Sequence, residues 1–199
     1  MKRLFFYLSV FIILATIASC KKDNGSSNGA GLTGNWKFVS MQGTTTTTEQ
    51  YSDGFDSYKT ISAIEYTTTD NVGTATFDAT TVVGNGIGYK VATTMHSELY
   101  IDNALEDTFA IPISVQLGPV NSTTKYTVVG ADSLYFEGQS VFNADPTGGV
   151  SNKSGAKYSI SGKTLTMTMN VAHDSVVYNS GYPTSQHVVA SLVSTMERQ

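Results

Sequence analysis

The sequence predicts an all-β fold, an up-and-down antiparallel β-barrel of about eight to ten strands, with a β-sandwich as the alternative. From Leu32 onward Thr, Val, Ile, Tyr and Phe dominate, and clusters of Gly, Asn and Asp recur at short intervals without a convincing helical pattern. Two segments, Tyr126–Gly130 and Tyr158–Gly162, share a Tyr-x-apolar-x-Gly pattern. This repetition predicts a meander of hairpins, which favours the barrel over the sandwich.

The clearest predicted strand is Thr164–Val171. Its alternation places Leu165, Met167, Met169 and Val171 on one face and polar residues on the other, as in a strand with one buried face. Weaker patterns predict further strands, some of which we expect to merge or bend: Asn35–Met41, Thr60–Thr68, Val72–Thr81, Gly88–Met95, Glu98–Asn103, Phe109–Gln116, Thr124–Gly130, Ser133–Glu137, Ala156–Ser161, Asp174–Tyr178 and Val188–Glu197.

The first of these strands contains Trp36, the only tryptophan of the chain. Alternation places Trp36, Phe38 and Ser40 on one face, and Lys37, Val39 and Met41 on the opposite face. A buried indole covers roughly 150–250 Å², which is worth several kcal/mol at about 25 cal/mol per Å². We therefore expect Trp36 and Phe38 to enter the core together.

The last strand brings an arginine to its end. Alternation over Val188–Arg198 places Arg198 on the same face as Leu192 and Met196. A guanidinium in phase with an apolar face requires a partner near the core, and stacking on Trp36 would contribute about 0.5–2 kcal/mol. A frayed terminus is the alternative.

The segment Leu32-Thr33-Gly34-Asn35-Trp36 resembles the Gly-x-Trp first strand of bacterial lipocalin-like lipoproteins. The resemblance covers residues 31–199 at the level of architecture. It implies a barrel in which the Trp36 side chain closes one end, with the Arg198 guanidinium packed on the indole as the second member of a structural pair. It also implies that the barrel interior holds a small apolar ligand, although the ligand-binding residues are unknown.

Residues 1–19 have the pattern of a signal peptide, with Lys2-Arg3 followed by an apolar run from Leu4 to about Thr16. The run is too short to cross a bilayer comfortably, since a helix needs about 20 residues for that. The polar residues 20–30 would then form a flexible tether to the domain at 31–199. An uncleaved membrane anchor is the alternative.

The segment Ile17-Ala18-Ser19-Cys20 resembles the lipobox of bacterial lipoproteins. The resemblance implies that Cys20, the only cysteine, is lipidated and anchors the protein to a membrane of the bacterial cell envelope. Because Lys21 rather than aspartate follows Cys20, the resemblance favours the outer membrane over the inner one.

Charge narrows the class of partner. All sixteen acidic residues follow Cys20, whereas removal of residues 1–19 would leave ten of the twelve basic ones, for a formal charge of −6. An acidic, sparsely charged domain argues against nucleic acid, whose phosphates are neutralised by Lys and Arg.

Two polar segments are expected to be loops, Gly43–Ser57 with its run of threonines and Asn143–Gly155. The first lies between the first two expected strands, where the lipocalin resemblance would place a loop over the barrel mouth. We favour the other interpretation, a disordered surface loop without that role.

The sequence contains no recognisable catalytic motif. His96 with Glu98 and His173 with Asp174 could contribute to a metal site or an acid–base pair, but no further ligands have metal-site spacing, and His187 stands apart. Asp53-Gly54-Phe55-Asp56 lacks the spacing of a calcium loop. We expect no catalytic residues, metal or cofactor, and the sequence therefore favours a non-enzymatic protein.

Two functions follow as expectations. The first is a lipid-anchored envelope lipoprotein whose barrel binds or carries a small apolar ligand. The second is a surface module whose Thr- and Tyr-rich loops contact a protein or a glycan.

Overall fold

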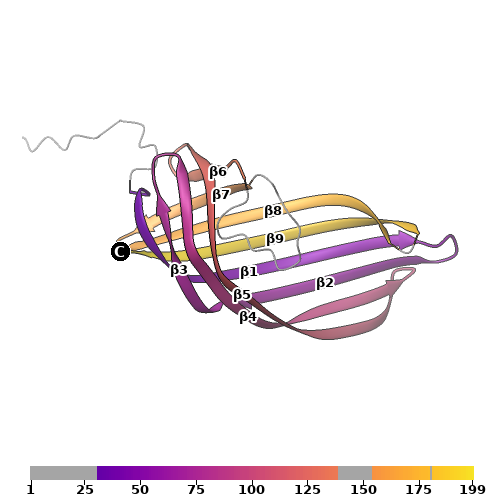
Figure 1. The fold of residues 1–199 in the computed structure, drawn as a ribbon. Coiled ribbons are helices and arrows are strands. Elements are labelled where there is room, and N and C mark those ends of the chain that lie inside the picture. Colours follow the sequence, from indigo (N-terminus) through magenta and orange to yellow (C-terminus); the bar gives the residue numbers. More distant parts are fainter. Residues whose placement is uncertain (1–30, 139–153, 180) are drawn as a thin grey trace, which may run out of the picture.

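The computed structural model describes residues 31–138, 154–179 and 181–199, and it confirms the all-β fold. The described strands are β1 Gly34–Ser52, β2 Ser57–Thr67, β3 Thr69–Phe77, β4 Thr81–Ile101, β5 Ala104–Val129, β6 Ser133–Phe136, β7 Ser154–Ser161, β8 Thr164–Asn179 and β9 Tyr182–Arg198. Every strand pairing is antiparallel, and from β3 to β9 each strand pairs with the next one in the chain (Figure 1). β2 and β3 do not pair with each other, and each lies between β1 and β4.

The strands form a nine-stranded sheet, and hydrogen bonds run around a ring of eight of them. The ring passes from β1 through β3, β4, β5, β6, β7, β8 and β9, and it closes where β9 pairs with β1. This barrel-like closure confirms the up-and-down arrangement. It brings the two ends of the described domain together, because Trp36 of β1 lies directly opposite Arg198 of β9.

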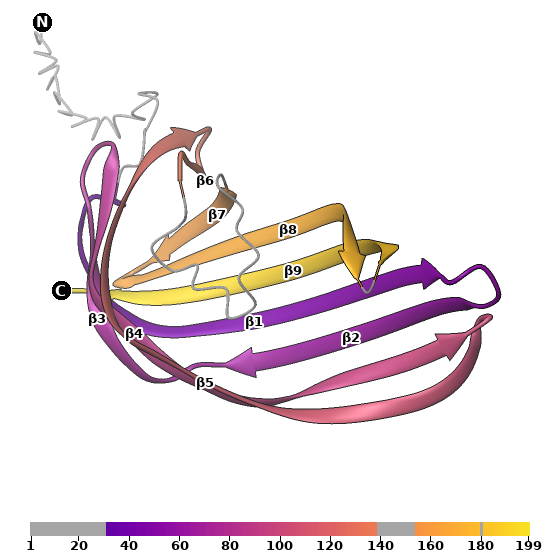
Figure 2. The same ribbon diagram turned by 45° about the vertical axis from the view of Figure 1, so that its right-hand side comes forward.

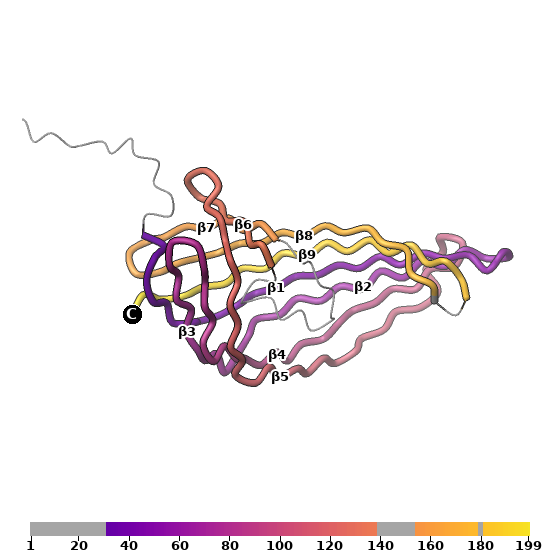
Figure 3. The backbone as a smooth tube through the Cα atoms, turned by 45° about the horizontal axis from the view of Figure 1, so that its top comes forward, coloured from indigo at the N-terminus to yellow at the C-terminus, as the bar shows by residue number. Residues whose placement is uncertain are grey.

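The ring is closed at one end only, which we call the base. β6 and β7 are short, whereas β4, β5, β8 and β9 continue well beyond them (Figure 2). Beyond the base the strands run side by side in the order β5, β4, β2, β1, β9, β8 (Figure 3). We call this curved extension the open half, and β5 and β8 are its edges among the described strands.

Backbone irregularities lie where the base meets the open half. The β3–β4 register shifts on both sides of Val72, and the β4–β5 register shifts between Gly84 and Tyr89. Gly73 lies there with φ of 100°, and a Cβ on it would come within 2.4 Å of the carbonyl oxygen of Gly86. Bulges and glycines let strands bend sharply, which accounts for the strong coiling of β3, β4 and β5 at this level.

Several expected strands merge, as the sequence allowed. β4 joins the expected strands Gly88–Met95 and Glu98–Asn103, and β5 joins Phe109–Gln116 and Thr124–Gly130. β8 likewise joins Thr164–Val171 and Asp174–Tyr178. The turns between strands hold glycines with positive φ, Gly130 before β6 and Gly162 before β8, as the repeated Tyr-x-apolar-x-Gly pattern predicted.

The expectation that Met41 faces away from Trp36 is wrong. The β1–β9 register shifts between Phe38 and Ser40, which inserts an extra residue into β1. The phase of β1 therefore changes, and Met41 is buried in the same core as Trp36 and Phe38. A single-residue bulge reverses every later position of a strand, because side chains alternate with a period of two.

The expectation that Gly43–Ser57 is a loop is also wrong. The threonines Thr44 to Thr48 lie in β1, where they pair with β2 on one side and β9 on the other. Only residues 53–56 form the turn between β1 and β2. Threonine suits a strand that is half exposed, because its β-branched side chain packs against its neighbours on a pleated surface. The other expected loop, Asn143–Gly155, lies outside the described residues except for its last two, which begin β7.

Candidate ligand-binding face

The interior of the base is filled by side chains. Its largest members, each less than 2% exposed, are Trp36, Phe38, Phe77, Phe136, Leu32, Met41, Ile87, Leu165, Met167 and Met196. Aromatic rings meet there at tilted or edge-on angles, with the Phe77 and Tyr126 centroids 5.7 Å apart. The base is therefore a packed core, and the candidate for a binding surface lies elsewhere.

Trp36 and Arg198 are in contact at the base. The indole is fully buried and its Nε1 donates a hydrogen bond to the carbonyl oxygen of Leu32, at 2.7 Å. The guanidinium carbon of Arg198 lies 4.6 Å from the centroid of the indole ring, and Nη2 donates to the carbonyl oxygen of Gly31. The arginine ties the chain before β1 to the end of β9, which is a structural role.

The open half has an inner face that continues the core side of the base. Residues directly opposite each other in antiparallel strands point to the same face, so the register identifies it. On β1 the inner positions after Met41 are Gly43, Thr45, Thr47, Glu49 and Tyr51, and their partners on the neighbouring strands share that face. These partners include Tyr66, Ile64, Ser62, Thr60 and Tyr58 on β2 and Leu192, Ala190, Val188, Gln186 and Thr184 on β9.

The two borders of the inner face differ, since the β5 border is apolar and the β8 border is mixed. On β5 the inner positions read Phe109, Ile111, Ile113, Val115 and Leu117, opposite Ser97, Met95, Thr93, Val91 and Tyr89 of β4. On β8 they read Met169, Val171, His173, Ser175 and Val177, opposite residues of β9. Three of these side chains are about two-fifths exposed, Phe109 at 43%, Ile111 at 42% and Val177 at 41%. The outer face of β5 is different, since Thr108, Ala110, Pro112, Ser114 and Gln116 alternate with the apolar residues.

The centre of the inner face is polar but hydrogen-bonded. The hydroxyl oxygens of Ser62 and Ser97 are 2.8 Å apart. Nε2 of Gln186 donates a hydrogen bond to Oε1 of Glu49 at 2.9 Å. The Ser175 hydroxyl donates to Oε1 of Gln186 at 3.3 Å. Glu49 is thus held by Gln186 of the neighbouring strand β9, and its side chain is half-buried on the inner face.

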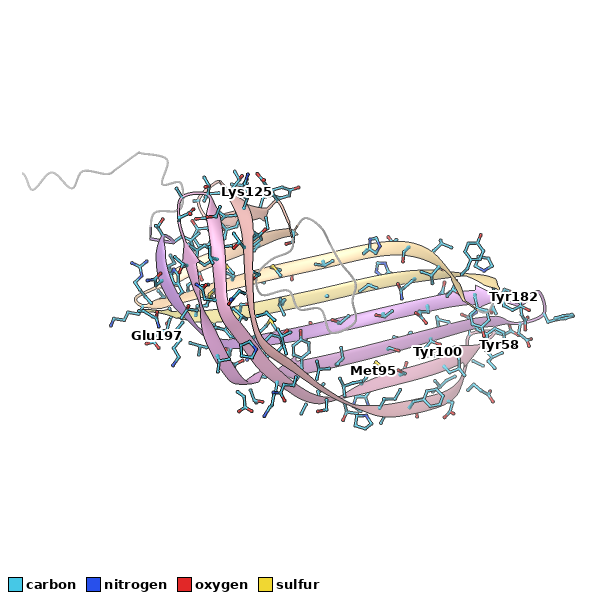
Figure 4. All side chains as sticks on the ribbon, viewed as in Figure 1. Tyr58, Met95, Tyr100, Lys125, Tyr182 and Glu197 are labelled. Carbon is cyan, nitrogen blue, oxygen red and sulfur yellow. The ribbon has the colours of Figure 1, made fainter. Side chains whose placement is uncertain are left out.

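Three tyrosines meet at the far end of the open half. The rings of Tyr51 and Tyr58 are stacked with centroids 4.7 Å apart, and the centroid of the Tyr182 ring lies 6.1 Å from that of Tyr51. Figure 4 labels Tyr58 and Tyr182 at this end of the sheet. The Tyr58 hydroxyl donates to Asp53, 3.3 Å away. Desolvation first, and then the negative charge of Asp53, raise the pKa of Tyr58. The amide N–H groups of Asp56 and Phe55 lower the pKa of Asp53, because they stabilise its charged form.

A recess of about 590 Å³ is an open hollow over β1, β8 and β9 near their far ends. Its lining includes His187, whose Nδ1 lies 2.6 Å from a carboxylate oxygen of Asp174. The serines of the recess do not contact this histidine: Ser175 donates to Gln186, and Ser185 donates to the carbonyl oxygen of Gln50. The recess therefore lacks the nucleophile–base contact that nucleophilic catalysis needs.

The histidine pairs expected from sequence are rearranged. Asp174 contacts His187 of β9 rather than His173, because adjacent residues of a strand point to opposite faces. Glu98 accepts a hydrogen bond from the Tyr100 hydroxyl at 2.6 Å. Among residues 31–138, 154–179 and 181–199, no three His, Cys, Asp or Glu side chains are grouped so that they could hold a metal ion.

The inner face of the open half was not predicted as a site, although its signal is present. From Phe109 to Leu117 apolar residues alternate with other residues over nine positions. In the open half β4 and β2 separate this segment of β5 from the threonine run of β1. The sequence pattern does not show that β6 and β7, which would cover these residues, are too short to do so. Cys20, the expected lipid attachment site, lies outside the described residues.

Across the part of the chain that the structure describes, no helix has the length and apolarity needed to span a bilayer. No protein-family model, no curated protein and no solved structure matches the chain.

Proposed function

We propose that the protein binds a small apolar or amphiphilic molecule on the inner face of its open half. The observation that carries the proposal is the run Phe109, Ile111, Ile113, Val115 and Leu117, which shares the phase of the core but has no wall opposite it among the described strands. Apolar surface covered by a ligand is worth about 25 cal/mol per Å². A bound ligand would therefore cover the apolar side chains of β5, as the packed side chains of the base cover one another.

A displacement assay tests this binding. The neutral dye N-phenyl-1-naphthylamine becomes fluorescent in apolar surroundings, so the full chain should enhance its emission. Trp36 is a poor reporter, because it is fully buried in the base, away from the open half. Native mass spectrometry should in addition show a small molecule that co-purifies with the protein.

The matched variants are Phe109→Gln on the inner face and Ala110→Gln on the outer face of the same strand. We expect Phe109→Gln to weaken dye binding by about tenfold, since a tenfold change corresponds to about 1.4 kcal/mol and a half-buried phenyl supplies that much. Ala110→Gln should leave the affinity within about twofold. Equal effects of the two variants, with both proteins folded, would contradict the proposal.

Anchoring through Cys20 is part of the proposed function. The lipobox-like segment before Cys20 and the polar residues after it support a lipid-anchored envelope protein, at the outer rather than the inner membrane. In a Gram-negative host, an alkyne-bearing fatty acid should label the wild-type chain and not Cys20→Ala. Membrane fractionation should find the labelled protein with the outer membrane. Equal labelling of both chains would rule out Cys20 as the attachment site.

A second candidate function is contact with a protein or glycan at the far end of the open half. Phe55, in the β1–β2 turn, is 94% exposed, and Tyr178, near the end of β8, is 80% exposed. Exposed aromatic side chains are frequent anchors of binding interfaces. In a glycan array, Phe55→Ser and Tyr178→Ser should lose any signal of the wild type while dye binding persists. A signal that is lost with Phe109→Gln instead would favour the inner face.

A further inference from the structure

The charge of the inner face limits the ligands that it accepts. In the open half the lysines are Lys59 and Lys90, and the register places both on the outer face. The acidic residues Glu49 and Asp107 lie on the inner face, opposite Gln186 and Leu99 respectively. No lysine or arginine among the described residues lies on the inner face of the open half. A ligand that lies on this face therefore meets the carboxylates of Glu49 and Asp107. Among the described residues, His173 on β8, opposite Val188, is the only basic side chain on this face.

Glu49 is oriented for an incoming donor. Its Oε1 accepts the hydrogen bond from Gln186 at 2.9 Å, and Ser175 holds the same glutamine from β8. Within the described residues Oε2 has no hydrogen bond. Because a carboxylate accepts several hydrogen bonds, Oε2 can accept one from a ligand without breaking the contact to Gln186.

The three tyrosines stand beside this carboxylate. Tyr51 is the next inner position after Glu49 on β1, and it stacks on Tyr58 and contacts Tyr182. The face of an aromatic ring attracts a cation, and the attraction strengthens when the cation is desolvated. The outer face already shows such a contact, since Nζ of Lys59 lies 4.3 Å from the centroid of the Tyr100 ring.

An apolar chain can extend from this point toward the base. Val188 follows Gln186 on the inner face of β9, and Leu99 lies opposite Thr60, which in turn lies opposite Glu49. Further toward the base the β5 residues Ile111 and Ile113 continue the apolar border. The face thus combines an anionic, aromatic end with an apolar length.

We propose that the ligand is a single-chain amphiphile with a positively charged amine or quaternary ammonium head. The head lies between Glu49 and the Tyr51–Tyr58–Tyr182 cluster, and the chain lies along the apolar residues toward the base. A carboxylate or phosphate head would meet Glu49 as a like charge, and this repulsion is stronger at a partly desolvated protein surface than in water. This assignment rests on the proposed function of the inner face.

The test uses matched ligands of one chain length, dodecylamine, dodecyltrimethylammonium, dodecanol and dodecanoate, below their micelle concentrations. Each ligand is titrated at pH 7 into the full chain carrying N-phenyl-1-naphthylamine, and the loss of dye fluorescence measures its affinity. We expect both cationic ligands to bind at least about tenfold more tightly than dodecanoate. The Glu49→Gln variant should lower this ratio severalfold, to the smaller preference that the tyrosine rings supply, while dodecanol affinity is unchanged. The control variant Glu65→Gln, on the outer face of β2, should keep the wild-type ratio.

The outcomes separate the two proposals. If no ligand displaces the dye, the proposed function fails. If dodecanol binds but dodecanoate binds as well as the amines, or Glu49→Gln leaves the ratio unchanged, the assignment of a cationic head is overturned and apolar binding stands. Should Glu49→Gln unfold, Tyr51→Leu provides the second variant, with a selective loss of dodecyltrimethylammonium affinity expected. An unchanged affinity in that variant would overturn the role of the tyrosines.

Discussion

The base and the open half share the strands β1, β4, β5, β8 and β9 but bury their inner faces to very different degrees. At the base, Trp36 and Met196 are fully buried, because β6 and β7 complete the ring around them. Farther along the same sheet, Phe109 and Ile111 remain more than two-fifths exposed. Alternation in sequence sets which face a side chain joins, but only an opposite wall removes that face from water. The comparison predicts that stability resides in the base and ligand binding in the open half.

The largest expected difference is between two aromatic truncations. Trp36→Ala should lower the free energy of unfolding by about 3–5 kcal/mol, because it leaves a cavity in a packed core. Phe109→Ala should cost only about 1–2 kcal/mol, since its half-exposed ring gains less from burial. Urea unfolding monitored by circular dichroism measures both. Equal losses would show that the inner face of the open half is as buried in solution as the base.

The junction of the two regions should be nearly as sensitive. Gly73→Ala adds a Cβ within 2.4–2.7 Å of backbone atoms of Gly86 and Ile87, at a φ of 100° that alanine rarely adopts. Strain of this kind and overpacking together should cost roughly 2–4 kcal/mol. The control is Gly162→Ala, which has a positive φ but no atom within 4 Å of the added Cβ, and should cost roughly 1 kcal/mol. If the control costs as much as Gly73→Ala, close packing at the junction is not the cause.

Arg198 should contribute less than either of these positions. Lysine cannot lay a planar guanidinium on the indole of Trp36, so Arg198→Lys should lower stability by about 0.5–1 kcal/mol, the range for exposed cation–π contacts. The adjacent Glu197→Gln is the control, because Glu197 is exposed and points away from the indole. A neutral Arg198→Lys change in urea unfolding would mean that the end of β9 is frayed.

The sequence was sufficient for the fold because the relevant signals are local. The alternation of Leu165, Met167 and Met169 predicted a buried face, and the structure has all three in the core. The placement of Arg198 in phase with Met196 likewise follows from the alternation of one strand. Both inferences needed only neighbouring residues.

The candidate site could not be predicted in the same way, because it depends on relations between distant segments. The exposure of Phe109 follows from the shortness of β6 and β7, which no pattern within β5 encodes. The threonine run was misinterpreted as a loop for a related reason, since its strand character depends on β2 and β9 beside it. The bulge between Phe38 and Ser40 depends on the pairing of β1 with β9, which the alternation within β1 does not encode.

The smallest expected effect compares a turn in each region as the pH falls. Hydrogen bonds from the Thr81 hydroxyl and from the amides of Thr80 and Thr81 lower the pKa of Asp78 at the base. Asp53, at the far end of the open half, has its pKa lowered by amides in the same manner. A depressed pKa in the folded state stabilises the fold above the ordinary value of 3.8, and this contribution is lost as the pH falls through the folded-state pKa.

NMR titration of the aspartate carboxyl carbons should therefore find both groups below 3.8, the ordinary value for aspartate. Thr81→Val removes the hydroxyl donor, so it should raise the pKa of Asp78 and leave that of Asp53 unchanged, because the two turns share no hydrogen bond. If Asp78 titrates at its ordinary value in the wild type, the turn between β3 and β4 is open in solution. A parallel rise at Asp53 would instead show that the base and the far end of the open half are coupled, which the separation of packed core from exposed face does not allow.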